Sequence, residues 1–266
     1  MSGTPLTVRI AVHAAASLVL AFLMLPILAV IPASFNHASF IYLPPKAASW
    51  RWYETFVADR EWMTALGNSA TVAVLTTAIA VVLGTLAALG LQRLNGRLRL
   101  LLNGLFLAPL IVPVIVTAVA LYRAIIDLQM TGSIWALAIG HAILALPLVV
   151  INVGISLRSI DPNWLRAAAG LGAGPWTIFR TVTLPNIVPG LVGGAVFAFL
   201  TSFDEVVISV FLAGYRTKTL PVKMWEAIRI EFTPEVAVAA TLLILVAVVL
   251  FAAARLARPP RTQVRP

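Results

Sequence analysis

The apolar residues of this chain fall into long runs that predict six membrane-spanning helices. A helix needs about twenty consecutive apolar residues to cross the hydrocarbon core of a bilayer. Only the fifth run contains charged residues, Asp204 and Glu205. We therefore expect an all-α membrane protein with a single transmembrane domain over residues 1–266, its helices covering approximately residues 10–32, 69–91, 100–122, 133–157, 187–213 and 236–254.

The first run resembles a secretory signal, because Arg9 precedes it and Ala29 and Ala33 lie near its end. Its apolar part is longer than that of a typical signal, so we interpret it as a retained first helix.

The distribution of charged residues predicts the orientation of the chain in the membrane. The chain is 61% hydrophobic and only 11% charged, with a net charge of +9, whereas a soluble domain has roughly 25% charged residues. With the N-terminus inside, the predicted cytoplasmic segments carry eleven basic residues against one acid, Asp161, and the rest carries eight basic residues against nine acids. Since positive residues are retained in the cytoplasm, both termini are predicted to be cytoplasmic. Nucleic acid is not needed to explain the charge, and the basic tail, 255–266, is expected to lie at lipid headgroups.

The predicted connections carry their own signals. Asn95-Gly96 predicts a tight inner turn, and the run 225–230 between Pro221 and Pro234 predicts a short outer helix. Prolines 109, 113 and 147 predict kinks that either bound a pathway or serve packing. The first outer segment is predicted to form a short amphipathic helix, more typical of an interfacial anchor than of a ligand-binding aromatic box, and its aromatic residues are Trp50, Trp52, Tyr53, Phe56 and Trp62.

The inner segment 161–189 is too short to bury a core of its own and is expected to dock on another protein. Asp161 is a good N-cap and Pro162 a good first helical residue, so a helix is predicted over 163–169. Glycines 172 and 174 then turn the chain. A second short helix is predicted to carry Trp176, Phe179 and Val182 on one face and to end at Leu184-Pro185, before the fifth membrane helix.

This segment resembles the EAA loop of permease subunits of binding-protein-dependent ABC importers. The family motif reads EAA, three residues, Gly, nine residues, Ile, any residue, Leu-Pro, and the chain matches it in spacing. The chain departs from the motif in carrying arginine where the family has glutamate, which removes or reverses in sign any ionic contact made there. The resemblance implies that the residues coupling this subunit to an ATPase are Arg166, Ala167, Ala168, Gly172, Val182, Leu184 and Pro185.

The similarity extends along most of the chain. Residues 202–207, 219–225 and 234–241 resemble the second permease subunit of spermidine/putrescine-type importers. This implies a MetI-like permease fold in the bacterial inner membrane, with five core helices plus one at the N-terminus. It also implies a second permease subunit, expected to be distinct, two copies of a cytoplasmic ATPase, and a periplasmic substrate-binding protein. Polyamine is the substrate that the resemblance favours; opines, aminoalkylphosphonates, thiamine and ferric iron are alternatives.

The residues themselves place ATP hydrolysis elsewhere. A phosphate-binding loop of the Walker type needs Gly-Lys followed by Ser or Thr, and none of Lys46, Lys218 and Lys223 follows a glycine. We therefore expect a transport subunit rather than an enzyme, with no cofactor or metal of its own and with ATP and Mg bound by the partner ATPase. An ion-coupled secondary transporter is a less favoured alternative, because such proteins distribute ionisable residues over several helices. A membrane sensor or scaffold is disfavoured because no signalling domain is attached.

Asp204 and Glu205 are the sharpest local signal, because an acid within a membrane helix is unfavourable by at least ~2.5 kcal/mol. Neighbouring helical residues point about 100 degrees apart. We expect one of the two to face the substrate pathway and attract a cationic amine, with Ser202 adding a hydroxyl, and the other to pair within the bundle, with Arg123 as a candidate partner. The alternative is a solvated or ion-paired surface position for both. His141 is expected to be a packed histidine with satisfied ring nitrogens rather than a proton relay.

Overall fold

The computed structural model describes residues 6–40, 42–45, 47–230 and 233–256. The chain divides into two compact units, residues 1–63 with 226–244, and residues 64–225 with 245–266. Apart from one isolated bridge between Asn36 and Ala48, the regular elements of the described residues are helical. Within this described part of the chain, five helices are long and apolar enough to cross a membrane, or six if one bent pair counts as a span. The basic tail beyond Leu256 lies outside the described residues.

The first unit contains α1 (Leu6–Ser34), α2 (Arg51–Ala58) and parts of α3 (Arg60–Arg93), α11 (Leu220–Ile230) and α12 (Pro234–Leu256). The predicted short helix in the first outer segment is confirmed as α2. The expectation that its aromatic residues lie at an interface is wrong for Trp52, Phe56 and Trp62, which are buried. The indole Nε1 of Trp52 donates to the Ala38 carbonyl at 3.2 Å, and the Phe56 and Trp62 rings pack at 5.3 Å. These rings form the core of a small folded segment.

The second unit is centred on α6 (Ile134–Arg158), against which α9 (Leu184–Phe203) packs closely. Two glycines of α9, Gly190 and Gly194, permit this close approach of α9 to α6. A Cβ at Gly190 would lie 2.6 Å from the Asn152 carbonyl oxygen, and one at Gly194 would lie 3.1 Å from the Val149 Cα. Small residues at helix contacts are the usual way in which membrane helices gain van der Waals packing.

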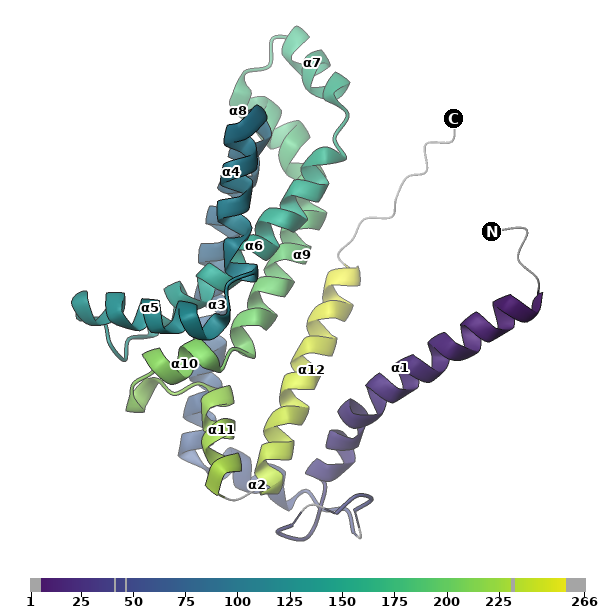
Figure 1. Ribbon diagram of the computed structural model, residues 1–266, viewed down its shortest axis with the longest axis vertical. Helices are drawn as coiled ribbons and strands as arrows, with labels where there is room; N and C mark the ends of the chain where they lie inside the picture. Colours follow the sequence, from purple (N-terminus) through teal and green to yellow (C-terminus); the bar gives the residue numbers. More distant parts are fainter. Residues whose placement is uncertain (1–5, 41, 46, 231–232, 257–266) are drawn as a thin grey trace. The chain divides into compact units, whose positions relative to one another are not determined.

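The predicted third membrane helix, 100–122, is not one straight helix. α4 (Gly96–Leu107) continues as a short 3-10 turn, Ala108–Leu110, and the chain then bends by 96° into α5 (Val114–Asp127), as Figure 1 shows. Pro113 has no N–H to donate and disfavours helical geometry at the residue before it. The prolines that predicted kinks here therefore produce a full break. The turn predicted before α4 is confirmed, with Gly96 at a φ of 65°.

The predicted fifth membrane helix, 187–213, is also interrupted. α9 ends at Phe203, and a separate short helix, α10 (Val207–Leu212), follows. α10 packs on α5 and α6, and its buried Ile208 and Leu212 join Ala118 and Ile125 of α5 in one apolar cluster. The segments that follow the two breaks are thus packed against each other. The remaining predicted spans are confirmed as parts of α1, α3, α6 and α12.

Candidate functional site

The segment that resembles an EAA loop forms a helical elbow at one end of the second unit (Figure 1). The Asp161 carboxylate accepts a hydrogen bond from the Asn163 N–H at 2.8 Å and begins α7 (Pro162–Gly170), as predicted. Gly172 then adopts a φ of 81°, a left-handed conformation that glycine takes without strain. This turn leads into α8 (Pro175–Ile178).

The predicted end of the second short helix at Leu184-Pro185 is wrong, because the helix continues. α8 passes through one π-helical turn, Phe179–Thr183, directly into α9. Within this turn the Leu184 N–H donates to the Phe179 carbonyl, five residues earlier. A π-turn of this kind is a local adjustment within a helix, and it admits Pro185, which has no N–H to donate. The elbow is therefore joined to a membrane-spanning helix without a flexible link.

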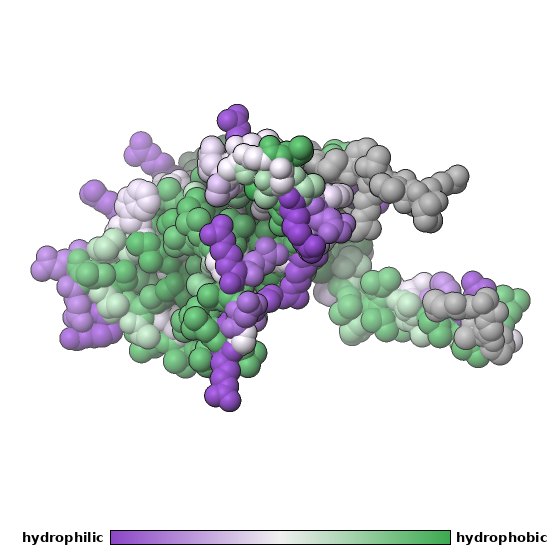
Figure 2. Space-filling view, turned by 90° about the horizontal axis from the view of Figure 1, so that it is seen from above, coloured by the Kyte–Doolittle hydropathy of each residue, from purple (hydrophilic) through white to green (hydrophobic). Residues whose placement is uncertain are grey.

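The elbow presents a surface of small, basic and apolar side chains. Of the predicted coupling residues, Arg166, Ala167, Gly172 and Pro185 are exposed, whereas Ala168, Val182 and Leu184 are half-buried. Leu171 at the turn is 89% exposed and Trp176 is 71% exposed. Figure 2, which looks onto this end, shows hydrophilic side chains beside hydrophobic surface. Exposed large apolar residues that adjoin polar ones are typical of docking surfaces. The sequence reasoning did not single out Leu171, although an apolar residue in a glycine turn was a signal for it.

The break after α9 is organised by Glu205. Its Oε1 accepts hydrogen bonds from the N–H groups of Val207 and Ile208 at 2.9 and 3.0 Å, and its Oε2 accepts from the Ser209 N–H at 3.1 Å. These are the amides that a helix leaves unpaired in its first turn. Glu205 is thus the carboxylate that satisfies the start of α10, and this explains how an acid is retained among apolar helices.

A buried polar chain connects this break to α3 and α6. His141 of α6 is fully buried, with Nδ1 at 2.9 Å from the Ser202 hydroxyl and Nε2 at 3.0 Å from the Ser209 hydroxyl. Ser202 also donates to Thr76 of α3 at 3.2 Å. The expectation that the ring nitrogens of His141 are satisfied is confirmed. The sequence reasoning missed Thr76 and Ser209, because hydroxyls in apolar helices more often bond their own backbone.

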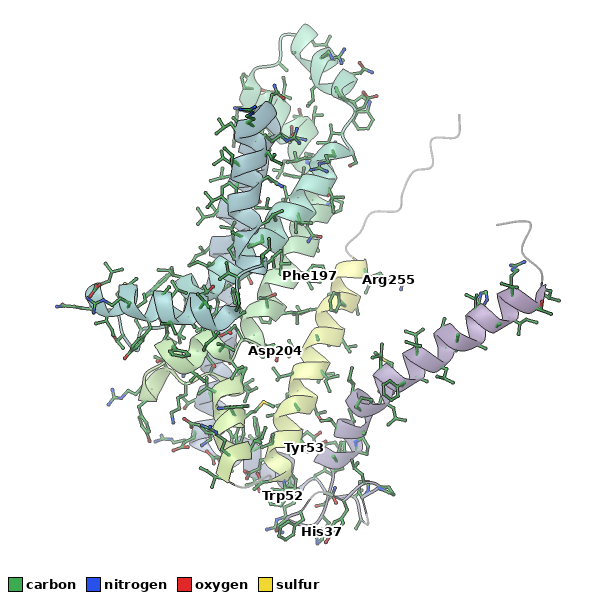
Figure 3. The ribbon with its side chains drawn as sticks, viewed as in Figure 1. His37, Trp52, Tyr53, Phe197, Asp204 and Arg255 are labelled. Carbon is green, nitrogen blue, oxygen red and sulfur yellow. The ribbon has the colours of Figure 1, made fainter. Side chains whose placement is uncertain are left out.

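Asp204 differs from its neighbours. It follows the last residue of α9 and its side chain is exposed, while Glu205 and Ser202 are buried. Within the described residues no hydrogen bond or ion pair is seen for its carboxylate. Figure 3 shows it at the end of α9. The proposed pairing of one of these acids with Arg123 is wrong, since Arg123 pairs with Asp127 one turn along α5, at 3.2 Å.

The chain can be placed among known proteins. Residues 80–261 match the family described as binding-protein-dependent transport system inner membrane component. The chain is 31% identical over 243 residues, covering 91% of it and 92% of the relative, to the spermidine/putrescine transport system permease protein PotC of Escherichia coli. It is also similar to the putrescine transport system permease protein PotI of the same organism, with 32% identity over 236 residues. That alignment covers 84% of this chain and 82% of PotI.

A solved structure agrees in fold. A chain of a bacterial ABC transporter involved in the import of the acidic polysaccharide alginate superposes with a TM-score of 0.71 at 15% identity, covering 97% of this chain and 100% of that one. A structure of a bacterial alginate ABC transporter in complex with alginate pentasaccharide-bound periplasmic protein also superposes, with a TM-score of 0.69 at 16% identity, covering 94% of this chain and 92% of that one. The all-α importer-permease fold expected from the resemblance is thus confirmed. The chain belongs to the inner membrane component family of binding-protein-dependent transport systems and is a multi-pass, non-catalytic permease subunit of an ABC importer.

Proposed function

We propose that this permease imports a polyamine of the spermidine or putrescine class. It works with a second, distinct permease subunit, two copies of a cytoplasmic ATPase that bind ATP and Mg, and a periplasmic binding protein. The support is similarity to two permeases named for these substrates, extending over more than four fifths of each chain. The basic end of the second unit, which includes the elbow, faces the cytoplasm by the excess of arginine there.

The elbow formed by residues 161–189 is the part that docks on the ATPase. The observation that carries this proposal is the continuity of the helix. The exposed turn at Leu171 leads into uninterrupted helix from Pro175 to Phe203, which includes α9. α9 alone spans about 30 Å at 1.5 Å per residue, so a displacement of the elbow reaches the helix break at Asp204. The contact surface comprises Arg166, Ala167, Ala168, Gly172, Val182, Leu184 and Pro185.

A charged substitution within the proposed contact surface tests the docking. Ala167→Glu adds a large anionic side chain at an exposed position of α7, so the fold of the subunit should be retained while the ATPase is held away. The matched control, Asn163→Glu, introduces the same glutamate in the first turn of α7, outside the proposed contact surface and at a position where a negative charge is favourable. We expect Ala167→Glu to abolish ATP-dependent uptake in proteoliposomes although the variant subunit is present in the membrane in the normal amount, and we expect Asn163→Glu to retain uptake. Equal uptake by the two variants would contradict the assignment.

Substrate passes beside the break between α9 and α10, with Asp204 as the carboxylate that attracts it. Helix breaks are tolerated at membrane depth where they line a cavity, and they form binding sites in transporters. Both oxygens of Glu205 already accept backbone N–H groups, and Ser202 is held by His141 and Thr76. Glu205 and Ser202 therefore hold the structure of the break in place, and the carboxylate of Asp204 is available to bind an ammonium group.

Uptake by the complete importer tests the substrate. The four components are reconstituted in proteoliposomes, and entry of labelled spermidine and putrescine is measured with and without internal ATP. We expect saturable uptake only with ATP and with all four components. Preference for an oxyanion or an amino acid over both polyamines would overturn the substrate assignment. Uptake that persists after inactivation of the ATPase would favour an ion-coupled transporter instead.

A further inference from the structure

A cavity lined by none of the proposed coupling or pathway residues lies at the basic end of the second unit. It has a volume of about 400 Å³ and lies between the end of α3, the length of α4 and the end of α6. Apolar side chains form most of its wall, among them Leu91, Leu107, Val150 and Ile151. The cavity is thus separate from both the elbow tip and the break at Asp204.

Two arginines lie at this cavity. Arg99 of α4 is half-buried, Arg158 at the end of α6 is exposed, and both line the cavity together with Gln92 and Asn103. Among the described residues, no carboxylate lies within ion-pair distance of either guanidinium. A half-buried arginine in an apolar setting is favourable only with a partner, because its desolvation is otherwise uncompensated. The cavity is therefore suited to an anion.

The start of α4 adds to the attraction. α4 has twelve residues and begins at Gly96, which itself lines the cavity, and no side-chain hydrogen bond caps it at Asn95. The unpaired N–H groups and the positive dipole end of a helix favour an anionic ligand such as a phosphate group. Backbone and side-chain donors therefore converge on one end of the cavity.

The position of the cavity indicates where the anion comes from. α3 ends at Arg93 and α6 at Arg158, so the arginines lie where two membrane spans end, and the apolar wall lies on the membrane side of them. This gradient, with cationic donors at the boundary and apolar surface below it, matches a phospholipid. Basic pockets between membrane helices on the cytoplasmic side are known to hold anionic headgroups. A polyamine, in contrast, would be repelled by two guanidinium groups.

We infer that this cavity is a binding site for an anionic phospholipid of the inner leaflet. Its phosphate lies between Arg99 and Arg158, and one acyl chain lies along the apolar wall. The inference uses the cytoplasmic orientation proposed above and is independent of the substrate. Because Arg158 is followed within three residues by Asp161, a lipid held there also fixes the base of the elbow.

The test measures lipid retained by the assembled importer. The complex is purified from nanodiscs containing equal phosphatidylglycerol and phosphatidylcholine, and bound lipid is quantified by native mass spectrometry. The wild type should retain phosphatidylglycerol in preference. With about a fivefold change in affinity per arginine, the double variant Arg99→Gln/Arg158→Gln should bind it roughly 25-fold more weakly. The control Arg93→Gln/Arg97→Gln removes the same charge from residues that do not line the cavity and should behave as the wild type.

A second pair of variants tests the acyl-chain part. Gly154 lines the cavity and has open space where a Cβ would lie, so Gly154→Leu should fill the apolar wall and reduce lipid retention. Gly90→Leu is the control, since Gly90 also has open space but lies outside the lining. Equal retention within both pairs would overturn the proposal, as would retention of both lipids without preference. Displacement of the lipid by millimolar inorganic phosphate would also overturn it, by indicating a site for the free anion.

Discussion

Removal of the Glu205 carboxylate should open the start of α10. In Glu205→Ala, the three N–H groups at the start of α10 lose their acceptor. The main chain at Ile208 and Ser209 is fully enclosed, with both residues at 0% exposure. Glu205 itself is only 8% exposed, so water has little access from which to replace the acceptor at these two positions. The substitution leaves two buried donors unsatisfied.

The expected magnitude follows from that count. A buried donor left without a partner is unfavourable by about 1–3 kcal/mol, so two such donors destabilise the closed start of α10 by about 2–6 kcal/mol. The lower limit corresponds to roughly a 30-fold increase in the population of the open form. The Val207 N–H does not add to this destabilisation, because that residue is only partly buried and water can reach it.

Hydrogen–deuterium exchange of the assembled importer measures this opening directly. We expect the amides of residues 207–209 to exchange at least roughly 30-fold faster in Glu205→Ala than in the wild type, since exchange from an open form follows its population. Glu205→Gln should lie between the two, because its amide oxygen remains a neutral acceptor. Asp204→Ala is the matched control, as it removes an adjacent carboxylate that caps nothing.

Equal exchange in the two alanine variants would show that Glu205 does not cap α10. If Glu205→Ala and Asp204→Ala gave equal exchange over 207–209, Glu205 would not hold the break, and the assignment of Asp204 as the available carboxylate would lose its basis. Exchange that rises along the whole of α9 would instead indicate general unfolding, so the amides of α9 serve as an internal reference.

Single substitutions test the helix contact at Gly190, the elbow turn at Gly172 and the carboxylate of Asp204. Gly190→Ala should lower the thermal unfolding temperature of the importer, because its Cβ meets backbone of α6, whereas Gly104→Ala, with open space at the Cβ, should leave it unchanged. Gly172→Ala should lower ATP-stimulated uptake, since it strains a φ of 81° by about 1 kcal/mol or more, while Gly170→Ala, in regular helix, should not; equal uptake would argue against a fixed elbow. Asp204→Asn should raise the KM for spermidine about fivefold, corresponding to about 1 kcal/mol for an exposed ion pair, and an unchanged KM would remove Asp204 from the pathway.

The sequence predicted the spans and the elbow because both depend on local signals. Apolar runs locate α3, α6 and α12, and the N-cap Asp161 with Gly172 locates the start and turn of the elbow. These features need no knowledge of distant contacts. The same holds for the turn at Gly96.

The helix breaks could not be predicted in this way. An apolar run in the sequence has the same pattern in a straight helix and in a bent one, so the sequence predicts only a kink where the chain bends by 96° near Pro113. Glu205 was read as a residue within a membrane helix, because its role depends on the three amides that follow and on burial by neighbouring helices. The buried chain through His141 joins residues more than sixty positions apart, and no local pattern encodes such a pairing.

If an ATPase on another subunit moves this chain through the elbow, a crosslinker placed at the elbow tip should reach that ATPase. The chain contains no cysteine, so Leu171→Cys provides a single thiol at a position that is 89% exposed. In inverted membrane vesicles carrying the whole importer, a photoreactive group on this thiol should crosslink to the ATPase, and the yield should change on addition of ATP. Labelling of the thiol only from the periplasmic side, or crosslinking to every component except the ATPase, would show that the elbow is not the contact through which the ATPase acts.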